Sequence, residues 1–313
     1  MGGVLQNILS IIVIVEYIIG NFVNGFIAVV NFVDWIKRKK ISSANQIITS
    51  LAISRIVFLW LQFLNWWLHE FYPDLLMTKD MVEMIYIAWS VTSHFNMWLS
   101  ACLSIFYFLK IANFSNATFL YLKWRVTKVI SVTLLVSLVL LLLNILLMKI
   151  YGNERISEYK TNMSCSSSSS DSTGFTRIVF FMQIGLALIP FTVSLTTFIL
   201  LIFSLWKHLK RMGHNVRGSR DASTKAHIKA LQTMIASLLL YTTFYLFFII
   251  YIINSGFLKR NLIVSFLLVS ILMGCPLGHS FVLILGNNDL KQASVLVLMW
   301  LRCWSKGVDS LDP

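Results

Sequence analysis

The sequence predicts an all-α membrane protein, a seven-transmembrane helix bundle followed by a C-terminal amphipathic helix 8. Hydrophobic residues make up 57% of the chain and charged residues only 12%, and the mean hydropathy is +0.76. Seven long apolar segments recur along the chain, and Lys and Arg residues gather in alternate connections between them. Length, apolarity and charge asymmetry together are typical of a protein that crosses a bilayer several times.

Each apolar segment is long enough to be a membrane span, because about 20 helical residues cross the hydrocarbon core. A backbone in lipid must satisfy its own hydrogen bonds, so each span is expected to be a helix. The connections are short and hold no apolar core, so residues 1–313 are expected to form one seven-transmembrane domain. The predicted spans are Ile8–Val33, Ile47–Leu68, Met81–Leu109, Lys128–Met148, Ile178–Leu205, Leu231–Ile253 and Asn261–Leu285.

The orientation follows from the basic residues. The first span is expected to be its own insertion signal, because no basic segment precedes it and it is longer than the apolar part of a signal peptide. With the N-terminus extracellular, 18 of the 26 Lys and Arg residues fall in inner segments, 7 in outer segments, and Arg55 lies within a span. Positive charge favours the cytoplasmic side. The sequence therefore predicts a multi-pass plasma-membrane protein with a cytoplasmic C-terminus. The net charge of +13 is explained by topology and anionic lipid rather than by nucleic acid.

Several connecting segments have a distinct composition. Lys110–Thr127 is basic and aromatic, and we expect it to hold an amphipathic piece along the inner membrane surface. Lys149–Arg177 includes a Ser-rich stretch without core-forming residues, and Trp206–Ala230 is polar and basic. After the last span, Asn287–Trp304 shows an apolar stripe at helical spacing, which predicts a helix lying in the inner interface.

Topology also sorts the modification sites. Asn-x-Ser/Thr occurs at Asn113, Asn116 and Asn162, but only Asn162 falls in an outer connection, so only Asn162 is expected to carry a glycan. Cys165 is the one cysteine in an outer connection and has no evident disulfide partner. Whether Cys303, near the inner leaflet, is acylated stays open.

Arg55 is the most unusual residue, since a guanidinium within a span is costly and normally faces the bundle interior or water. Asn21 and Asn24 in the first span, and His279 with Ser280 in the seventh, are candidates to share its hydrogen bonds. Two interpretations stay open: the network of Asn24, Arg55, His279 and Ser280 is a polar tie between helices, or it is the hinge of a conformational switch.

Patterns typical of enzymes are missing from the sequence. His208, His214 and His227 share one polar connection but lack the HExxH spacing of a zinc hydrolase. There is no nucleophile elbow, Gly-rich phosphate loop or pair of catalytic carboxylates. We therefore expect no enzyme activity, no catalytic residues, no cofactor and no metal site.

Aromatic residues concentrate near the outer ends of several spans. Part of this enrichment is expected to form the Trp/Tyr belt of the membrane interface. The rest predicts a pocket with aromatic walls and few polar points, namely Ser93, Asn96, Tyr241 and Ser265. The aromatic residues concerned are Trp66, Trp67, Tyr86, Trp89, Phe244, Tyr245, Phe248 and Tyr251.

Several stretches along the chain match one family of receptors. The sequence resembles the type 2 taste receptors, the bitter-taste G-protein-coupled receptors, from the first span to the eighth helix, and it is most similar to the broadly tuned members. The stretches FYFLKIANFS and HSFVLILGN stand where other receptors carry their Asp-Arg-Tyr and Asn-Pro-x-x-Tyr motifs. The stretches that carry the resemblance are Gly20–Ile27, Leu51–Arg55, Phe106–Ser115, Leu122–Arg125, Pro190–Phe191, Ser194–Leu195, Asp221–His227 and His279–Asn287.

The resemblance implies a receptor for diverse small bitter agonists that activates a gustducin-like, Gi-type heterotrimeric G protein. It also implies contact with membrane lipid, a sterol among the candidates. In the activation mechanism that we expect, the G protein would meet Tyr107, Lys110, Lys207, Lys210 and Arg211, although the basic residues of the Trp206–Ala230 connection are equally explained by topology alone. The family's pocket positions correspond to Trp66, Trp89, Ser93, Tyr241, Phe244, Phe248, Ser265 and Val269, and Asn96 joins the predicted pocket as one of its polar points.

A transporter or channel for small molecules is the competing class. It is less favoured because the sequence shows no inverted repeat, no matching pair of Gly- or Pro-broken spans, and no ring of charges for a selectivity filter. The sequence names neither the agonists nor their affinities, and it leaves the tissue of expression and the oligomeric state open.

Overall fold

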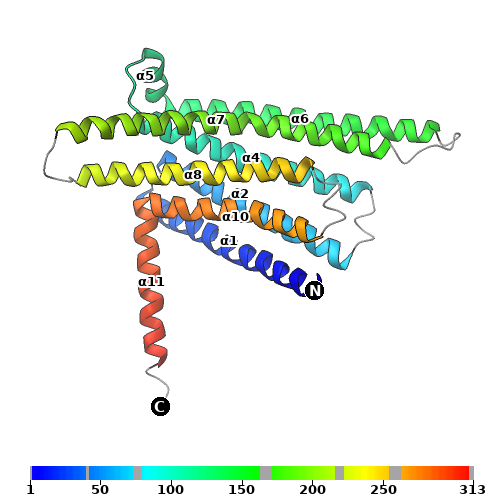
Figure 1. The fold of residues 1–313 in the computed structure, drawn as a ribbon, viewed down its shortest axis with the longest axis horizontal. Helices are drawn as coiled ribbons and strands as arrows, with labels where there is room; N and C mark the ends of the chain where they lie inside the picture. The colour runs from blue at the N-terminus through cyan, green and yellow to red at the C-terminus, as the bar shows by residue number, and fades with distance from the viewer. Residues whose placement is uncertain are drawn as a thin grey trace.

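The computed structural model describes residues 2–39, 42–72, 79–162, 171–215, 222–253 and 262–309. Within these ranges, seven long helices run side by side as a bundle (Figure 1). They are α1 (Gly2–Arg38), α2 (Ser43–Phe71), α4 (Lys79–Ile111), α6 (Val126–Asn162), α7 (Asp171–Asn215), α8 (Ala222–Ile253) and α10 (Leu262–Gly286). Two further helices, α5 (Ala117–Trp124) and α11 (Asn288–Asp309), lie at one end of the bundle.

The bundle is a closed ring with α4 in a central place. α1 packs against α2 and also against α10, so the first and last long helices are neighbours. α10 packs against α8, α8 against α7, and α4 contacts α2, α6 and α7. The chain begins at one end of the bundle and α11 starts at the other (Figure 1). This arrangement confirms the predicted all-α seven-helix fold.

The predicted spans fall within these helices, apart from Asn261, which is outside the described residues. The helices are longer than the spans, and this corrects the predicted connections. α6 continues to Asn162 and α7 begins at Asp171, so much of the expected Lys149–Arg177 connection is helical. Likewise, α7 continues to Asn215 and α8 begins at Ala222. A helix does not stop where hydropathy falls, because polar residues such as Lys and Glu are good helix formers.

Six of the long helices are apolar enough, by length and composition, to cross a membrane within the residues searched: α1, α2, α6, α7, α8 and α10. α4 differs because it carries a series of small polar side chains. Ser90, Thr92, Ser93, Asn96 and Ser100 are all buried in the bundle. The central position of α4 explains this composition, since its polar groups meet other helices rather than lipid.

The exterior of the bundle is apolar and part of its interior is polar. On α6, Leu135 is 64% exposed, and Val132, Val139 and Leu142 are exposed beside it. A protein in water rarely exposes such a continuous apolar surface, but lipid tails cover it without cost. The described helices therefore form a multi-pass membrane protein.

One glycine and two prolines have local effects on the long helices. Gly20 brings α1 close to α2, because a Cβ there would lie 2.8 Å from Cδ1 of Leu59. Pro190 in α7 and Pro276 in α10 each lack the N–H that would bond to the preceding turn, so each removes one helical hydrogen bond. Helices in a membrane bundle tolerate this because neighbouring groups can satisfy the freed carbonyl.

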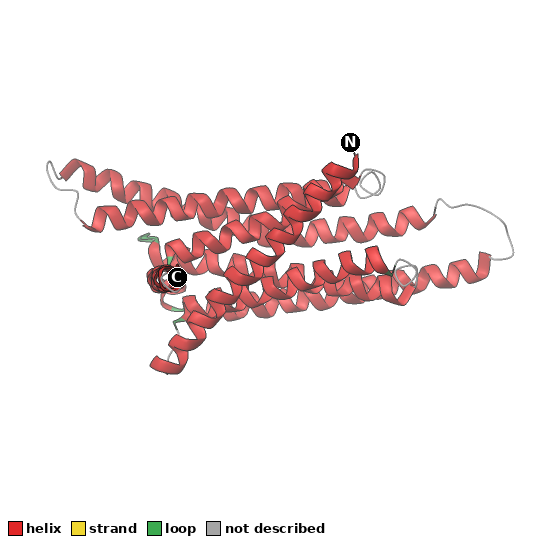
Figure 2. Cartoon of the chain, turned by 90° about the horizontal axis from the view of Figure 1, so that it is seen from below, coloured by secondary structure: helices red, strands yellow, loops and turns green. Residues whose placement is uncertain are grey.

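At the end of the bundle, α11 turns away from the bundle axis, and Figure 2 shows it nearly end-on. Asn287 Oδ1 accepts hydrogen bonds from the backbone N–H of Asp289 (3.0 Å) and Leu290 (3.4 Å), so Asn287 caps α11. The Nδ2 group of Asn287 donates to Oδ1 of Asn45 on α2 (3.0 Å). Leu290 is fully buried at the start of α11, while the apolar Leu296 and Trp300 farther along the helix are exposed.

The predicted amphipathic piece between the third and fourth spans is α5. Asn116 caps it, with Oδ1 accepting from the backbone N–H of Thr118 (2.8 Å). Phe119 on α5 packs edge-on against Phe108 of α4 (centroids 5.4 Å apart), while Trp124 is 91% exposed. α5 is thus held by one aromatic side and leaves the other side open.

Candidate functional site

The centre of the predicted outer pocket is an aromatic stack between α4 and α8. The rings of Trp89 and Phe248 are stacked with centroids 5.6 Å apart and planes at 12°. Phe244 stacks on Phe248 in turn, with centroids 6.0 Å apart. Tyr245 contacts Phe244 edge-on, and its ring centroid lies 4.5 Å from that of Phe191 on α7. The structure therefore brings Trp89, Phe244 and Phe248 together.

Below this stack, polar side chains of α4 meet Tyr241. Ser93 and Asn96 are buried on α4, and the Tyr241 hydroxyl donates to the backbone carbonyl of Met97 (3.2 Å). A small cavity of about 20 Å³ lies at this level, lined in part by Asn96, Tyr241 and Phe244. Three predicted pocket residues thus border one small cavity between α2, α4, α8 and α10.

The other predicted pocket residues lie apart from this stack. Trp66 is half-buried on α2 and contacts Phe63, with ring centroids 5.8 Å apart. Val269 is half-buried on α10. Ser265 lies on α10, but its side chain is outside the described residues. Among the ring contacts of the described residues, none joins Trp66 to Trp89.

Arg55 is at the centre of the predicted switch network and is only 3% exposed. Its Nη1 donates to Ser280 Oγ (2.6 Å), its Nη2 to His279 Nδ1 (2.6 Å), and its Nε to Asn96 Oδ1 (3.5 Å). Because guanidinium only donates, Nδ1 of His279 must accept, which places the imidazole proton on Nε2.

Asn24 joins this network through Ser280, whose hydroxyl is 2.8 Å from Asn24 Oδ1 and 3.1 Å from the carbonyl oxygen of Pro276. The four predicted switch residues are therefore in one hydrogen-bonded cluster that links α1, α2, α4 and α10. Asn21 is not part of it, since its amide donates to the carbonyl of Tyr17 one turn earlier in α1. Asn96, a residue of the predicted ligand pocket, also belongs to the cluster.

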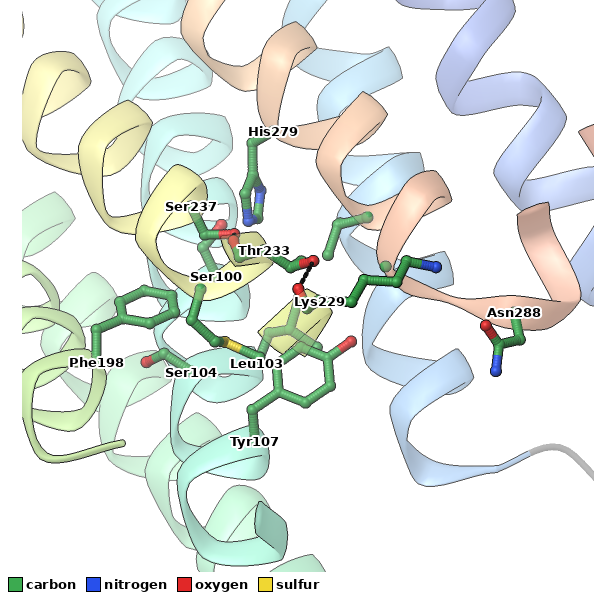
Figure 3. Close-up of a pocket in the computed structure, with 13 residues that line it drawn as sticks. Ser100, Leu103, Ser104, Tyr107, Phe198, Lys229, Thr233, Ser237, His279 and Asn288 are labelled. Carbon is green, nitrogen blue, oxygen red and sulfur yellow. Dashed lines mark hydrogen bonds between the residues drawn. The ribbon is translucent and has the colours of Figure 1, made fainter. Parts of the chain in front are cut away.

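A larger cavity of about 170 Å³ opens at the end of the bundle that carries α11 (Figure 3). It lies between α4, α7, α8 and α10. Tyr107, one of the residues predicted to meet the G protein, lines this cavity. His279 of the switch network also lines it, on the side away from Tyr107 and Asn288. Its polar lining consists of Ser100, Ser104, Tyr107, Lys229, Thr233, Ser237, His279 and Asn288.

The remaining residues predicted to face the G protein lie near the same end. Lys110 is exposed in the last turn of α4, and Lys207 and Lys210 are exposed on α7. The Lys210 ammonium lies 5.8 Å from the ring centre of Trp206. Arg211 is on α7, with its side chain outside the described residues. Asn162 is the last residue of α6, at the opposite end of the bundle, and its side chain is likewise not described.

Sequence reasoning missed Ser100 and Ser104 of α4, together with Thr233 and Ser237 of α8. A signal for them was present, because Ser93, Asn96, Ser100 and Ser104 recur every three to four residues in an apolar span. Such spacing places small polar groups on one helix face, which indicates a face turned toward other helices or a cavity.

The arrangement suits binding rather than covalent chemistry. Within the described residues, no group of three His, Cys, Asp or Glu side chains is placed to hold a metal ion. The aromatic stack offers flat apolar surfaces, and the polar cluster below it joins four helices. Such an arrangement can couple an occupant at the aromatic stack to the packing of the end that carries α11.

Comparison with known proteins gives one consistent result. The family model described as taste receptor protein (TAS2R) matches residues 1–302. Taste receptor type 2 member 14 of Pongo pygmaeus is 51% identical over 302 residues, and that of Homo sapiens is 50% identical, with 96% of this chain and 94% of each relative covered. Taste receptor type 2 member 125 of Rattus norvegicus is 49% identical over 313 residues, with both chains covered completely.

Proposed function

The chain belongs to the TAS2R taste receptor family, and we propose that it detects small bitter compounds in the outer aromatic pocket and activates a gustducin-like heterotrimeric G protein at its inner end. Family membership makes it a membrane receptor and not an enzyme. The proposed orientation places the N-terminus outside the plasma membrane and the α11 end in the cytosol, as the distribution of basic residues favours.

The observation that carries the pocket proposal is the stack of Trp89 on Phe248. Flat aromatic surfaces bind many shapes of apolar compound and discriminate weakly among them, because few fixed polar groups define one orientation. We therefore expect micromolar affinities, equivalent to about −7 to −8 kcal/mol. Asn96 and Tyr241 would supply the few polar contacts at the pocket floor, and a membrane sterol is a further candidate occupant.

Activation is proposed to act through the position of α8. Tyr241, Phe244 and Phe248 are on α8, and so are Thr233 and Ser237 of the inner cavity. A compound that contacts the first group more favourably in one arrangement of α8 shifts the population toward that arrangement. The inner cavity would then widen toward the G protein, with Tyr107 in its wall and Lys110, Lys207, Lys210 and Arg211 around its mouth.

Trp89→Ala tests the pocket. The variant loses the stacking surface on Phe248, and we expect responses to most agonists to disappear or their EC50 to rise at least about tenfold, equivalent to 1.4 kcal/mol. The measurement is calcium release in cells that carry a promiscuous G protein, with surface expression determined in parallel. Trp67→Ala is the matched control, because Trp67 packs with Phe71 and Tyr72 on the exposed side of α2.

Unchanged dose–response curves for Trp89→Ala at normal surface expression would rule out this pocket. The same compounds should produce no flux across proteoliposomes containing the purified protein. Flux without G-protein signalling would instead favour the transporter class.

A further inference from the structure

We propose that the open side of α5, formed by Leu120, Tyr121 and Trp124, binds the anionic headgroups of membrane phospholipids at the α11 end of the bundle. This inference goes beyond the proposed function, because it concerns how the receptor is seated in the bilayer and not what it detects. The proposed orientation enters only in naming the cytoplasmic leaflet as the one concerned. Three observations support the proposal: the composition of this side, its continuity with α6, and its level along the bundle.

The open side of α5 is apolar and aromatic. Leu120 and Tyr121 are exposed, and Trp124 is 91% exposed. These residues lie three to four positions apart, so they share one face of the helix. Phe119, on another face, is buried and packs against Phe108 of α4. Exposed Trp and Tyr are typical of the membrane interface, because the ring meets acyl chains while its polar atom meets the headgroup layer.

The charges beside these rings are all positive. No Asp or Glu occurs in residues 84–153, whereas Lys123, Arg125 and Lys128 follow one another around the end of α5. Lys123 has a partner, since its Nζ donates to the carbonyl of Ala112 at the end of α4 (2.9 Å). Arg125 and Lys128 are exposed, and the Arg125 guanidinium lies 4.9 Å from the ring centre of Tyr121. The phosphate of an anionic headgroup would supply the opposite charge for these two cations.

The open side of α5 is continuous with a surface that lipid covers. α6 begins at Val126, two residues after Trp124. Along one side of α6, the exposed residues Lys128, Val132 and Leu135 are three or four positions apart. Val132 and Leu135 belong to the apolar exterior of the bundle, and Lys128 lies one turn before them. A change from apolar residues to Lys and Trp along one surface is typical of the boundary between the hydrocarbon core and the headgroups.

α5 also lies at the side of the bundle and not at its tip. Figure 1 shows α5 and α11 at the same level along the bundle, projecting to opposite sides. α7 continues beyond this level. Its Ser204 Oγ accepts from the backbone N–H of Asn113, shortly before α5 begins (3.1 Å), and the 11 residues from Ser204 to Asn215 extend about 16 Å farther. A protein that approaches from the aqueous side meets the end of α7 first, which favours the bilayer as the partner of α5.

The test places a photoreactive group on the open side of α5. p-Benzoylphenylalanine replaces Trp124, whose exposed ring leaves room for the larger group. The purified full-length receptor is reconstituted in nanodiscs with equal amounts of phosphatidylserine and phosphatidylcholine. After irradiation, mass spectrometry measures the ratio of the two lipids among the adducts. We expect phosphatidylserine to be enriched at least about fivefold, the factor that one cation near an anionic membrane surface contributes.

Arg125→Gln combined with Lys128→Gln is the decisive variant. It keeps polar side chains but removes both charges, so the adduct ratio should fall to the lipid ratio of the bilayer. Lys207→Gln combined with Lys210→Gln is the matched control, because it removes the same charge and Lys210 also lies beside an aromatic ring, 5.8 Å from the centre of Trp206. These two lysines lie farther along α7, beyond the level of α5, so the control should keep the enrichment.

Three outcomes would overturn the proposal. No lipid adducts, or adducts in the lipid ratio of the bilayer, would mean that the open side of α5 does not select anionic headgroups. An equal loss of enrichment in the two double variants would mean a general effect of net charge. If added G protein replaced the lipid adducts by adducts to one of its subunits, this surface would belong to the G protein. None of these measurements uses an agonist, so the proposed bitter-compound pocket is tested separately.

Discussion

At the scale of single residues, the middle of the bundle is held by side chains whose geometry matters as much as their charge. Arg55 reaches Ser280 and His279 on α10 and Asn96 on α4 because its planar guanidinium presents donors in three directions. A lysine has the same charge but presents all its donors from one atom, so it cannot bond to all three partners at once.

We therefore expect Arg55→Lys to destabilise the receptor by about 3–6 kcal/mol, since hydrogen bonds to a charged group are worth about 1.5–3 kcal/mol each and two of three are lost. The measurement is the midpoint of thermal unfolding of the purified protein, with both variants in the same buffer. Asn21→Ala serves as a comparison, because the Asn21 amide bonds only to its own helix. A midpoint equal to that of the wild type would contradict the role assigned to the network.

Part of this residue-level arrangement was predictable from the sequence. A charged or amide side chain inside an apolar span must find a polar partner within the bundle, which correctly pointed from Arg55 to Asn24, His279 and Ser280. The same rule named Asn21 beside Asn24 as a candidate partner, although the predicted network contained only Asn24. Only the rotation of α1 about its axis decides which of the two amides faces α10.

At the scale of helices, α11 depends on one residue at the junction with α10. Asn287 caps α11 with its oxygen and ties it to α2 with its nitrogen. Two substitutions separate these roles, because aspartate keeps the accepting oxygen but loses the donor, whereas alanine loses both.

We expect Asn287→Ala to speed hydrogen–deuterium exchange of the first backbone amides of α11 by about fivefold, equivalent to a cap energy of about 1 kcal/mol. Asn287→Asp should leave that exchange close to the wild-type rate, since its carboxylate still caps the helix and also favours the helix N-terminus. If both variants exchanged at the same raised rate, the tie to Asn45 and not the cap would hold the first turn.

The existence and order of the long helices followed from hydropathy, but their ends did not. Hydropathy reports where lipid begins, and α6 continues from Met148 to Asn162 through polar residues that form helix readily. α4 shows that a membrane helix can also have low hydropathy. Its buried serines and Asn96 lower its hydropathy, yet its long apolar segment and the flanking spans still predicted it as a span.

At the scale of the whole molecule, the two ends of the bundle have different chemistry. The α11 end carries the larger cavity, Lys110, Lys207 and Lys210, while the aromatic stack of Trp89 lies toward the other end. Sequence could predict the charge asymmetry, because it needs only the alternation of spans. It could not place the cavities, which depend on how α4, α8 and α10 pack together.

The orientation predicts a single glycan. Asn162, at the end opposite α11, should be modified, whereas Asn113 and Asn116, next to α5, should not. We expect endoglycosidase treatment to raise the electrophoretic mobility of the wild type, and Asn162→Gln alone to have the mobility of the treated protein. A glycan that persists in Asn162→Gln and disappears when Asn113 and Asn116 are both replaced would reverse the proposed orientation.

The contact between α1 and α10 includes one hydroxyl group, that of Ser280, with two possible hydrogen-bond acceptors. The Ser280 hydroxyl has a single hydrogen, but two acceptor oxygens lie at hydrogen-bond distance, Oδ1 of Asn24 and the carbonyl oxygen of Pro276. The hydroxyl can donate to only one of these two oxygens at a time. Rotation about the Cβ–Oγ bond of Ser280 therefore decides whether its hydrogen bond links α10 to α1 or stays within α10. This link between the two helices can form or break without a movement of either helix.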